Sequence, residues 1–296
     1  MIVDPDARGA YVLEVRSTLP FWGALTVIIL MPLLLVGCSS FRANDESVLE
    51  EVADAPVELR MRHREIHGWS IRYLESVSPG TPQVVLIHGA PGSLDSFAPY
   101  FRDEPLATTV RLTAPDRPGY GYSDYGRIVT EIREQARLLR PLIEPGAIIV
   151  GHSYGGTVAA RLAMDYPELV GGLVLVSASV SPEHERIFFF NGPMEWPLLN
   201  WMLSPGWRLA NAEKVTRVAE LREMEPLWHR IRVPVTVIHG TEDELVPYEH
   251  ARYAVDRLSS VSARLITLEG EGHFILWSEV DLIREVILDL AGSADQ

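Results

Sequence analysis

The chain has 296 residues, of which 47% are hydrophobic and 22% are charged, a composition typical of a globular protein with a substantial core. Its formal net charge of −14 at pH 7 argues against a nucleic-acid partner, because an acidic surface repels phosphates. The only cysteine, Cys38, excludes an intramolecular disulfide.

The first predicted element is an uncharged apolar run over residues 19–37, followed by Cys38 and two serines. Such a run ending in small residues is typical of a secretory signal. The tetrapeptide Leu35-Val36-Gly37-Cys38 resembles the lipobox of bacterial lipoproteins, in which the cysteine is lipidated and begins the mature chain. This resemblance implies that residues 1–37 are a signal peptide and that the protein faces the periplasm or the exterior from the bacterial cell envelope.

A transmembrane anchor is the alternative for the same residues, because about 20 apolar residues can span a bilayer. A buried core helix fits Pro20 and Pro32 poorly. On either of the first two interpretations, a lipid or a helix at the N-terminus attaches the chain to a membrane. Residues 38–55 are mostly polar and are expected to be a tether.

Predicted strands and helices alternate after residue 55. The first pair of strands, over 57–76, turns at His67-Gly68, a hairpin signal. Six later apolar runs have the length and composition of buried strands, and three segments show helical spacing of apolar residues or follow a glycine pair. The strands are expected at 83–89, 109–116, 147–151, 170–178, 233–240 and 262–270, and the helices at 128–146, 155–167 and 279–292.

This alternation predicts an α/β fold with a mainly parallel, doubly wound sheet covered by helices on both faces. The leading hairpin adds antiparallel strands at one edge. The core is expected to comprise residues 56–180 and 227–296. Residues 181–226 interrupt the alternation and are expected to form a small helical cap or lid. Within it, we expect an apolar substrate pocket lined by some of Phe188, Phe189, Phe190, Trp196 and Trp201.

The candidate nucleophile is Ser153, in Gly151-His152-Ser153-Tyr154-Gly155. It follows a predicted strand and opens a predicted helix, which is the strand–turn–helix setting of a nucleophile elbow. Gly151 and Gly155 suit this turn because neighbouring backbone leaves no room for a Cβ atom. The helix N-terminus favours the negative charge that develops during nucleophilic attack.

Two further motifs precede the elbow, His88–Gly92 (HGAPG) and Asp116–Ser123 (DRPGYGYS). With the GHSYG motif, they make the chain similar to the α/β-hydrolase superfamily over about residues 57–292. The resemblance implies an α/β-hydrolase fold and a hydrolase activity. A serine at the elbow argues against epoxide hydrolases and haloalkane dehalogenases, which carry aspartate there. It leaves esterases, amidases, peptidases, lactonases and C–C bond hydrolases.

The family order of nucleophile, acid and base implies a triad of Ser153, Asp243 and His273. His273 follows the last predicted strand and would act as the general base. Asp243 lies in GTEDELVP after an earlier strand and would orient the imidazole. Glu242 and Glu244 are rivals for this role, although the spacing of the motif favours Asp243.

The oxyanion hole needs two N–H donors. Tyr154, after the nucleophile, is one candidate, and Ala90 in the HGAPG loop is the other, since Pro91 has no N–H. The glycine-flanked histidines, His88, His152 and His239, are expected to be structural. Asp116 and Arg117 are expected to brace loops. No histidine spacing suggests a metal site, and no cofactor is expected.

We therefore expect a serine hydrolase that forms an acyl-enzyme on an ester or related carbonyl of a small apolar substrate. A carboxylic ester hydrolase is favoured. The HGAPG loop is similar to the HGGPG of proline iminopeptidases, so a peptidase or amidase is an alternative, although DRPGYGYSD departs from the DQRG usual there. A C–C hydrolase and a catalytically silent binding protein on the same fold are further alternatives. The sequence predicts no oligomeric state.

Overall fold

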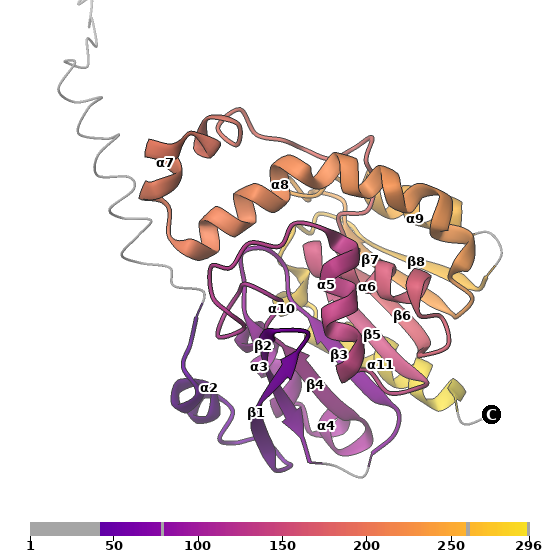
Figure 1. The fold of residues 1–296 in the computed structure, drawn as a ribbon. Helices are drawn as coiled ribbons and strands as arrows, with labels where there is room; N and C mark the ends of the chain where they lie inside the picture. Colours follow the sequence, from indigo (N-terminus) through magenta and orange to yellow (C-terminus); the bar gives the residue numbers. More distant parts are fainter. Residues whose placement is uncertain (1–41, 78–79, 259–260, 295–296) are drawn as a thin grey trace, which may run out of the picture.

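The computed structural model describes residues 42–77, 80–258 and 261–294, and Figure 1 shows their arrangement. The predicted signal peptide or anchor and Cys38 lie outside these residues. In the part of the chain that is described, no helix is both long enough and apolar enough to cross a membrane.

An eight-stranded sheet forms the centre of the fold, in the order β1-β2-β4-β3-β5-β6-β7-β8. The two edge strands of the predicted hairpin run antiparallel, and the strands from β4 to β8 are parallel. The predicted fold class is therefore confirmed. The strands are β1 (Leu59–Ile66), β2 (Trp69–Ser76), β3 (Gln83–Ile87), β4 (Arg111–Pro115), β5 (Ala147–His152), β6 (Val170–Val176), β7 (Val235–Gly240) and β8 (Ala263–Leu268).

Helices cover both faces of this sheet, because the central strands are apolar on both sides. In β3, Val85 and Ile87 join one buried cluster, whereas Val84 and Leu86 join the other. The first cluster packs against α5 (Ile132–Leu139), α6 (Tyr154–Asp165) and α9 (Glu249–Arg257). The second packs against α3 (Ala98–Arg102), α4 (Glu104–Thr109), α10 (Ile275–Ser278) and α11 (Val280–Ala294).

Two predicted segments differ from the structure. The helix expected over 128–146 is limited to α5, and Ile128, placed on its apolar face, is exposed. Residues 42–55 are not a free tether, because Asp45–Glu51 form the helix α2. Asn44 caps this helix by accepting a hydrogen bond from the Ser47 N–H at 2.8 Å. Val48 and Val52 lie one turn apart and are buried in the core, which holds α2 against it.

The connection between β6 and β7 contains η3 (Pro193–Glu195), α7 (Pro197–Met202), α8 (Pro205–Met224) and η4 (Glu225–Arg230). Figure 1 shows α7 at one end and α8 running from it across the core toward α9. Leu209, Leu221 and Met224 of α8 are buried, so this long helix is seated on the core. We refer to residues 181–226 as the cap.

Candidate active site

Ser153 occupies a sharp turn between β5 and α6. Its φ is +55°, a left-handed conformation that is unusual for a residue with a side chain. The turn is held from several directions. The Ser153 N–H donates to the Val176 carbonyl at 2.9 Å, and the Ser153 carbonyl accepts from the N–H groups of Gly156 and Ser179 at 3.0 and 3.2 Å. These bonds fix a strained turn that places the hydroxyl at the start of α6.

Glycines allow this turn to pack against its neighbours. A Cβ atom on Gly155 would lie 2.1 Å from the Ile87 carbonyl oxygen, and one on Gly151 would lie 2.4 Å from the Gly155 carbonyl oxygen. Both obstacles are backbone atoms, so neither can move aside easily. A Cβ on Gly89 would lie 3.1 Å from Cβ of Ser153. The HGAPG loop therefore lies directly against the candidate nucleophile.

The structure brings Asp243 and His273 together. Nδ1 of His273 and Oδ2 of Asp243 are 2.7 Å apart, and both side chains are buried. The other carboxylate oxygen accepts from the N–H groups of Leu245 and Val246 at 2.9 and 2.8 Å. Burial works to raise the pKa of Asp243, but hydrogen bonds from His239 and His273 outweigh it and hold that pKa well below its usual value. Asp243 is therefore an anion fixed in place.

This contact determines which nitrogen of His273 carries the proton. An ionised carboxylate only accepts hydrogen bonds, so Nδ1 of His273 is the donor. Nε2 of the neutral ring is then left as the acceptor that a general base requires. Glu242 and Glu244, the rival carboxylates, are exposed. Among the three, the structure joins only Asp243 to His273.

His152 lies beside His273, and Nε2 of His239 lies 3.4 Å from Oδ2 of Asp243. Burial, followed by the nearby His273, lowers the pKa of His152 to about 3. Its ring centre lies 4.9 Å from that of His273, and its Nε2 lies 3.2 Å from the His273 carbonyl oxygen. His239 Nε2 lies 2.8 Å from the Val246 carbonyl oxygen, which positions it as a donor. Both histidines thus support the loops that carry the pair.

Ala90 is oriented by the peptide group that it shares with Gly89. The Gly89 carbonyl accepts from Arg117 Nη2 at 3.1 Å and contacts His88 Nδ1 at 2.8 Å. In a trans peptide the carbonyl and the following N–H point in opposite directions. Arg117 and His88 therefore direct the Ala90 N–H away from themselves, on the loop that lies against Ser153. The Tyr154 N–H is the second candidate donor, because N–H groups in the first helical turn have no acceptor within the helix.

His88 itself is a neutral ring in a fixed tautomer. Its Nε2 accepts from the Arg117 N–H at 2.9 Å, so its proton must lie on Nδ1, facing the Gly89 carbonyl. Burial, and then the charge of Arg117, lower the pKa of His88 well below its usual value. Arg117 also donates from Nε to the His88 carbonyl at 2.9 Å. Arg117 thus braces the HGAPG loop through three separate contacts.

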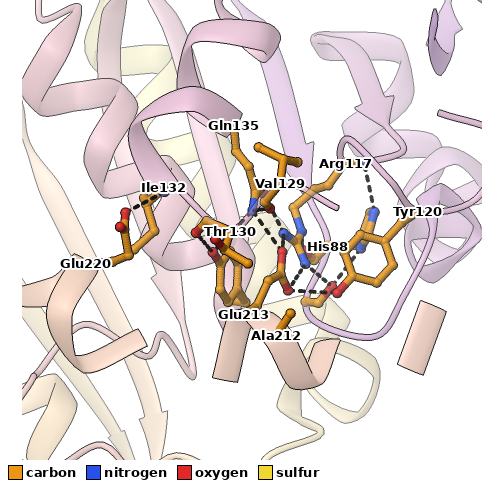
Figure 2. A network of polar contacts seen from close by, with 12 residues as sticks. His88, Arg117, Tyr120, Val129, Thr130, Ile132, Gln135, Ala212, Glu213 and Glu220 are labelled. Carbon is orange, nitrogen blue, oxygen red and sulfur yellow. Dashed lines mark hydrogen bonds and ion pairs between the residues drawn. The ribbon is translucent and has the colours of Figure 1, made fainter. Parts of the chain in front are cut away.

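The cap extends this bracing, and the residues responsible were not anticipated. Figure 2 shows Glu213 reaching from α8 to Arg117, Tyr120 and Gln135. Glu213 accepts from Arg117 Nη1 at 2.8 Å, from the Tyr120 hydroxyl at 2.7 Å and from Gln135 Nε2 at 2.8 Å. Gln135 Nε2 also lies 3.2 Å from the Tyr154 hydroxyl. All five side chains are buried, so a polar network links the cap to both candidate oxyanion donors.

The cap aromatics do not form the expected pocket. Phe189, Trp196 and Trp201 are 93%, 65% and 75% exposed, and Phe190 is exposed as well. Phe188 is half-buried and stacks on Phe190, with ring centres 5.4 Å apart. Short proline-started helices leave these side chains without a second apolar layer to pack against. Their predicted role as pocket lining is therefore wrong for the exposed members.

Other aromatic side chains lie beside the candidate base. The Phe274 ring centre is 5.6 Å from that of His273, and the Trp277 ring centre is 5.2 Å from that of His152. Both side chains are partly exposed. They give the approach to His273 an apolar border. Across the described residues, no group of three or more His, Cys, Asp or Glu side chains is placed to hold a metal ion.

Comparison with known proteins identifies the family. The model of the alpha/beta hydrolase family matches residues 84–286, more than half of the chain. The chain belongs to the α/β-hydrolase family. Within the family, it is 27% identical over 254 residues to a 2-hydroxy-6-oxononadienedioate/2-hydroxy-6-oxononatrienedioate hydrolase of Pseudomonas putida, covering 71% of this chain and 88% of that one.

One further relative and one solved structure match this chain over different shares of its length. A dihydrolipoyllysine-residue acetyltransferase component of the acetoin cleaving system of Cupriavidus necator is 31% identical over 136 residues. That match covers 45% of this chain and only 36% of the relative. The solved structure of a membrane phospholipase A, described as a bacterial virulence factor, has a TM-score of 0.64 at 19% identity, covering 92% of this chain and 95% of that one. The last likeness concerns the fold.

Proposed function

We propose that this α/β-hydrolase is a serine hydrolase in which Ser153 is the nucleophile, His273 the general base and Asp243 the residue that orients the base. The observation that carries this proposal is the buried 2.7 Å contact between His273 Nδ1 and Asp243 Oδ2. His273 also contacts His152, the residue that precedes Ser153 at the strained strand-to-helix turn. A serine hydroxyl is a weak nucleophile until a base accepts its proton. The tautomer of His273 leaves Nε2 ready to do so.

In the first half of the reaction, the Ser153 oxygen bonds to the carbonyl carbon of the substrate while its proton passes to His273 Nε2. The carbonyl oxygen becomes an oxyanion, which the N–H groups of Ala90 and Tyr154 stabilise. The intermediate collapses, the bond to the leaving group breaks, and His273 returns the proton to that group. Asp243 stays ionised and stabilises the imidazolium that forms in between.

In the second half, water takes the place of the leaving group. His273 accepts a proton from the water, whose oxygen attacks the acyl carbon on Ser153. Collapse of the second oxyanion intermediate breaks the ester bond to Ser153, and the serine oxygen recovers its proton from His273. The products are a carboxylic acid and free enzyme, so the cycle needs no metal or cofactor.

We propose an ester or a related carbonyl of a small apolar molecule as the substrate. The apolar border formed by Phe274 and Trp277 beside the base supports this choice. Among the relatives, one is named as a phospholipase and another as an acetyltransferase component, and both names concern acyl groups. We further propose that the protein acts at the bacterial cell envelope, held there by a lipid on Cys38 or by residues 19–37 as an anchor.

A fluorophosphonate probe tests the nucleophile in the full chain. We expect mass spectrometry to find one adduct on Ser153, and Ser153→Ala to abolish it. Ser278→Ala, which alters an exposed serine of α10, is the matched control and should react like the wild type. Turnover of a panel of p-nitrophenyl esters should disappear with the adduct. Failure of the folded wild type to react would contradict the proposal and favour a silent binding protein, and turnover of aminoacyl anilides alone would favour an amidase.

A further inference from the structure

Large apolar side chains gather on the outside of the cap. The described residues contain twelve such side chains that are exposed, and half of them fall between residues 187 and 201. We name these six the cap patch. Its members are Ile187, Phe189, Phe190, Trp196, Leu198 and Trp201. A concentration of this kind marks a surface that meets another apolar phase or partner.

The cap patch carries almost no charge. The segment from 187 to 203 contains one ionisable side chain, Glu195. Glu195 accepts a hydrogen bond from the amide of Asn211 on α8, so it is paired within the cap. The chain as a whole is acidic, with a formal net charge of −14, which disfavours approach to an anionic surface. The cap patch is thus a neutral apolar face on an acidic protein.

The local structure keeps these side chains outward. Pro193 and Pro197 begin two short helices, η3 and α7, and α7 has no buried residue. Helix α8, by contrast, buries its own apolar residues against the core and is held by Glu213. The cap is therefore fixed through α8, while α7 and the Phe188–Phe190 segment present apolar side chains to the surroundings.

The described chain begins at the same end of the cap. The guanidinium of Arg42 lies 3.9 Å from the Tyr122 ring centre and 4.8 Å from that of Tyr125. The Tyr125 hydroxyl in turn accepts from the Gly206 N–H, at the start of α8, at 3.3 Å. Figure 1 shows this start of α8 next to α7. Arg42 is thereby tied to the end of the cap that carries α7.

This position limits the distance to any membrane attachment. Four residue steps separate Cys38 from Arg42, and an extended chain spans about 14 Å in four steps. Whether residues 19–37 are an anchor or Cys38 carries lipid, the membrane must lie within that reach of Arg42. Since α2 is packed on the core, no long tether can move the domain away. On the proposed N-terminal attachment, the end of the cap with α7 is therefore held near the bilayer.

We propose that the cap patch lies against a lipid bilayer, with Trp196 and Trp201 at the interface and the Phe and Leu side chains directed toward the acyl chains. Tryptophan is favoured at this depth because its ring is apolar and its indole N–H is polar. The proposal depends on the proposed N-terminal attachment and not on the chemistry of Ser153. Because the cap patch is neutral, its contact with lipid does not require anionic headgroups.

Quenching by brominated lipid tests this contact. The experiment uses the full chain with Trp22→Phe, a substitution that removes the tryptophan of the apolar segment. This protein is reconstituted into phosphatidylcholine vesicles. We expect brominated phosphatidylcholine to quench at least half of the emission contributed by Trp196 and Trp201. Adding Trp196→Ser and Trp201→Ser should abolish the quenching. Trp228→Phe, a buried tryptophan of η4, is the matched control and should leave the quenched component unchanged.

Two further readings separate this proposal from its rivals. Quenching should be equal at low and high salt, and a loss at high salt would assign the contact to charged groups elsewhere and overturn the proposal. Absence of quenching, together with a dimer in detergent that Trp201→Ser dissociates, would assign the cap patch to a second copy of the chain. The melting temperature and the fluorophosphonate labelling of Ser153 should not change in the double serine variant. A loss of quenching in that variant then reports the missing tryptophans and not unfolding of the protein.

Discussion

Glu213 on α8 and Arg117 after β4 form a buried ion pair, with Oε1 and Nη1 2.8 Å apart although 96 residues separate them in the chain. Arg117 simultaneously donates to the carbonyls of His88 and Gly89. The cap helix therefore sets the position of the side chain that orients the Ala90 N–H. Cap placement and the geometry of the HGAPG loop are parts of one network.

Glu213→Gln should damage both stability and catalysis. The amide cannot neutralise Arg117, and breaking a buried pair from one side costs about 3 kcal/mol of unfolding free energy. If Arg117 then releases the Gly89 carbonyl, loss of one oxyanion donor lowers kcat by about 100-fold, with little change in KM. Urea unfolding and ester turnover measure the two effects.

Glu220→Gln is the matched control for that change. Glu220 lies on the same helix and accepts from the Ile132 N–H at 2.9 Å, away from Arg117 (Figure 2). An amide oxygen can keep this bond, so kcat should stay within about twofold of the wild type because no oxyanion donor is disturbed. Equal losses of kcat in the two variants would show that α8 acts through general stability and not through Arg117.

Asp243→Asn should lower kcat by about 10⁴-fold while the fold persists, because an amide cannot hold the His273 proton on Nδ1 and leave Nε2 free. The change is nearly isosteric, and Asn can still accept from the N–H groups of Leu245 and Val246. Glu242→Gln and Glu244→Gln are the controls, since both carboxylates are exposed and neighbours in sequence. Comparable loss in either control would shift the acid away from Asp243.

The mainly parallel sheet with its leading hairpin could be predicted because its signals are local. Continuous apolar runs such as residues 83–87 indicate strands buried on both faces, and glycine-rich turns separate them from helices. The helix α2 was missed for the same reason. Its mostly polar sequence holds Val48 and the exposed Leu49, and Val52 follows at its C-cap. Burial of the two valines is a tertiary fact that no local pattern carries.

The candidate site likewise contains residues that a local sequence signal identifies and residues that only tertiary contacts reveal. Ser153, Asp243 and His273 follow strand ends, and motif order groups them without a structure. Glu213 has no such signal, because a buried carboxylate on α8 looks like any helical glutamate until Arg117 is found beside it. The outward orientation of the cap aromatic side chains also could not be predicted from the sequence. Hydrophobicity marks Trp196 and Trp201 as apolar but does not say which side of a short helix meets the core.

Gly155→Ala should destabilise the elbow. The added methyl would lie 2.1 Å from the Ile87 carbonyl oxygen of β3, and a central strand cannot retreat without disturbing its ladder. Overpacking of this kind costs about 3 kcal/mol of unfolding free energy, and displacement of the turn should slow fluorophosphonate labelling of Ser153. Gly192→Ala is the control, because no atom lies within 4 Å of its added methyl and its φ is −61°. Similar melting temperatures for the two variants would contradict the packing explanation.

Acidification should destabilise the fold through its buried histidines. Burial lowers the pKa of His250 to about 4 and that of His152 to about 3, and it also lowers the pKa of His88. Between pH 6 and pH 4, each of these three histidines therefore binds a proton in the unfolded chain but not in the folded chain. Burial raises the pKa of Asp116 to about 6, which offsets one of them. For these four groups together, the net two protons lower the unfolding free energy by about 3 kcal/mol for each pH unit of acidification near pH 5.

His250→Asn isolates one part of this slope. Nδ1 of His250 accepts from the N–H groups of Val180 and Ser181, both at 2.9 Å, and an asparagine oxygen can take over as acceptor without binding a proton. Urea unfolding at a series of pH values near 5 should then give a slope lower by about 1.4 kcal/mol per pH unit than that of the wild type. An unchanged slope would mean that His250 binds its proton equally in the folded and unfolded chains, and that its burial beside Glu185 at 3.9 Å does not exclude the charged ring.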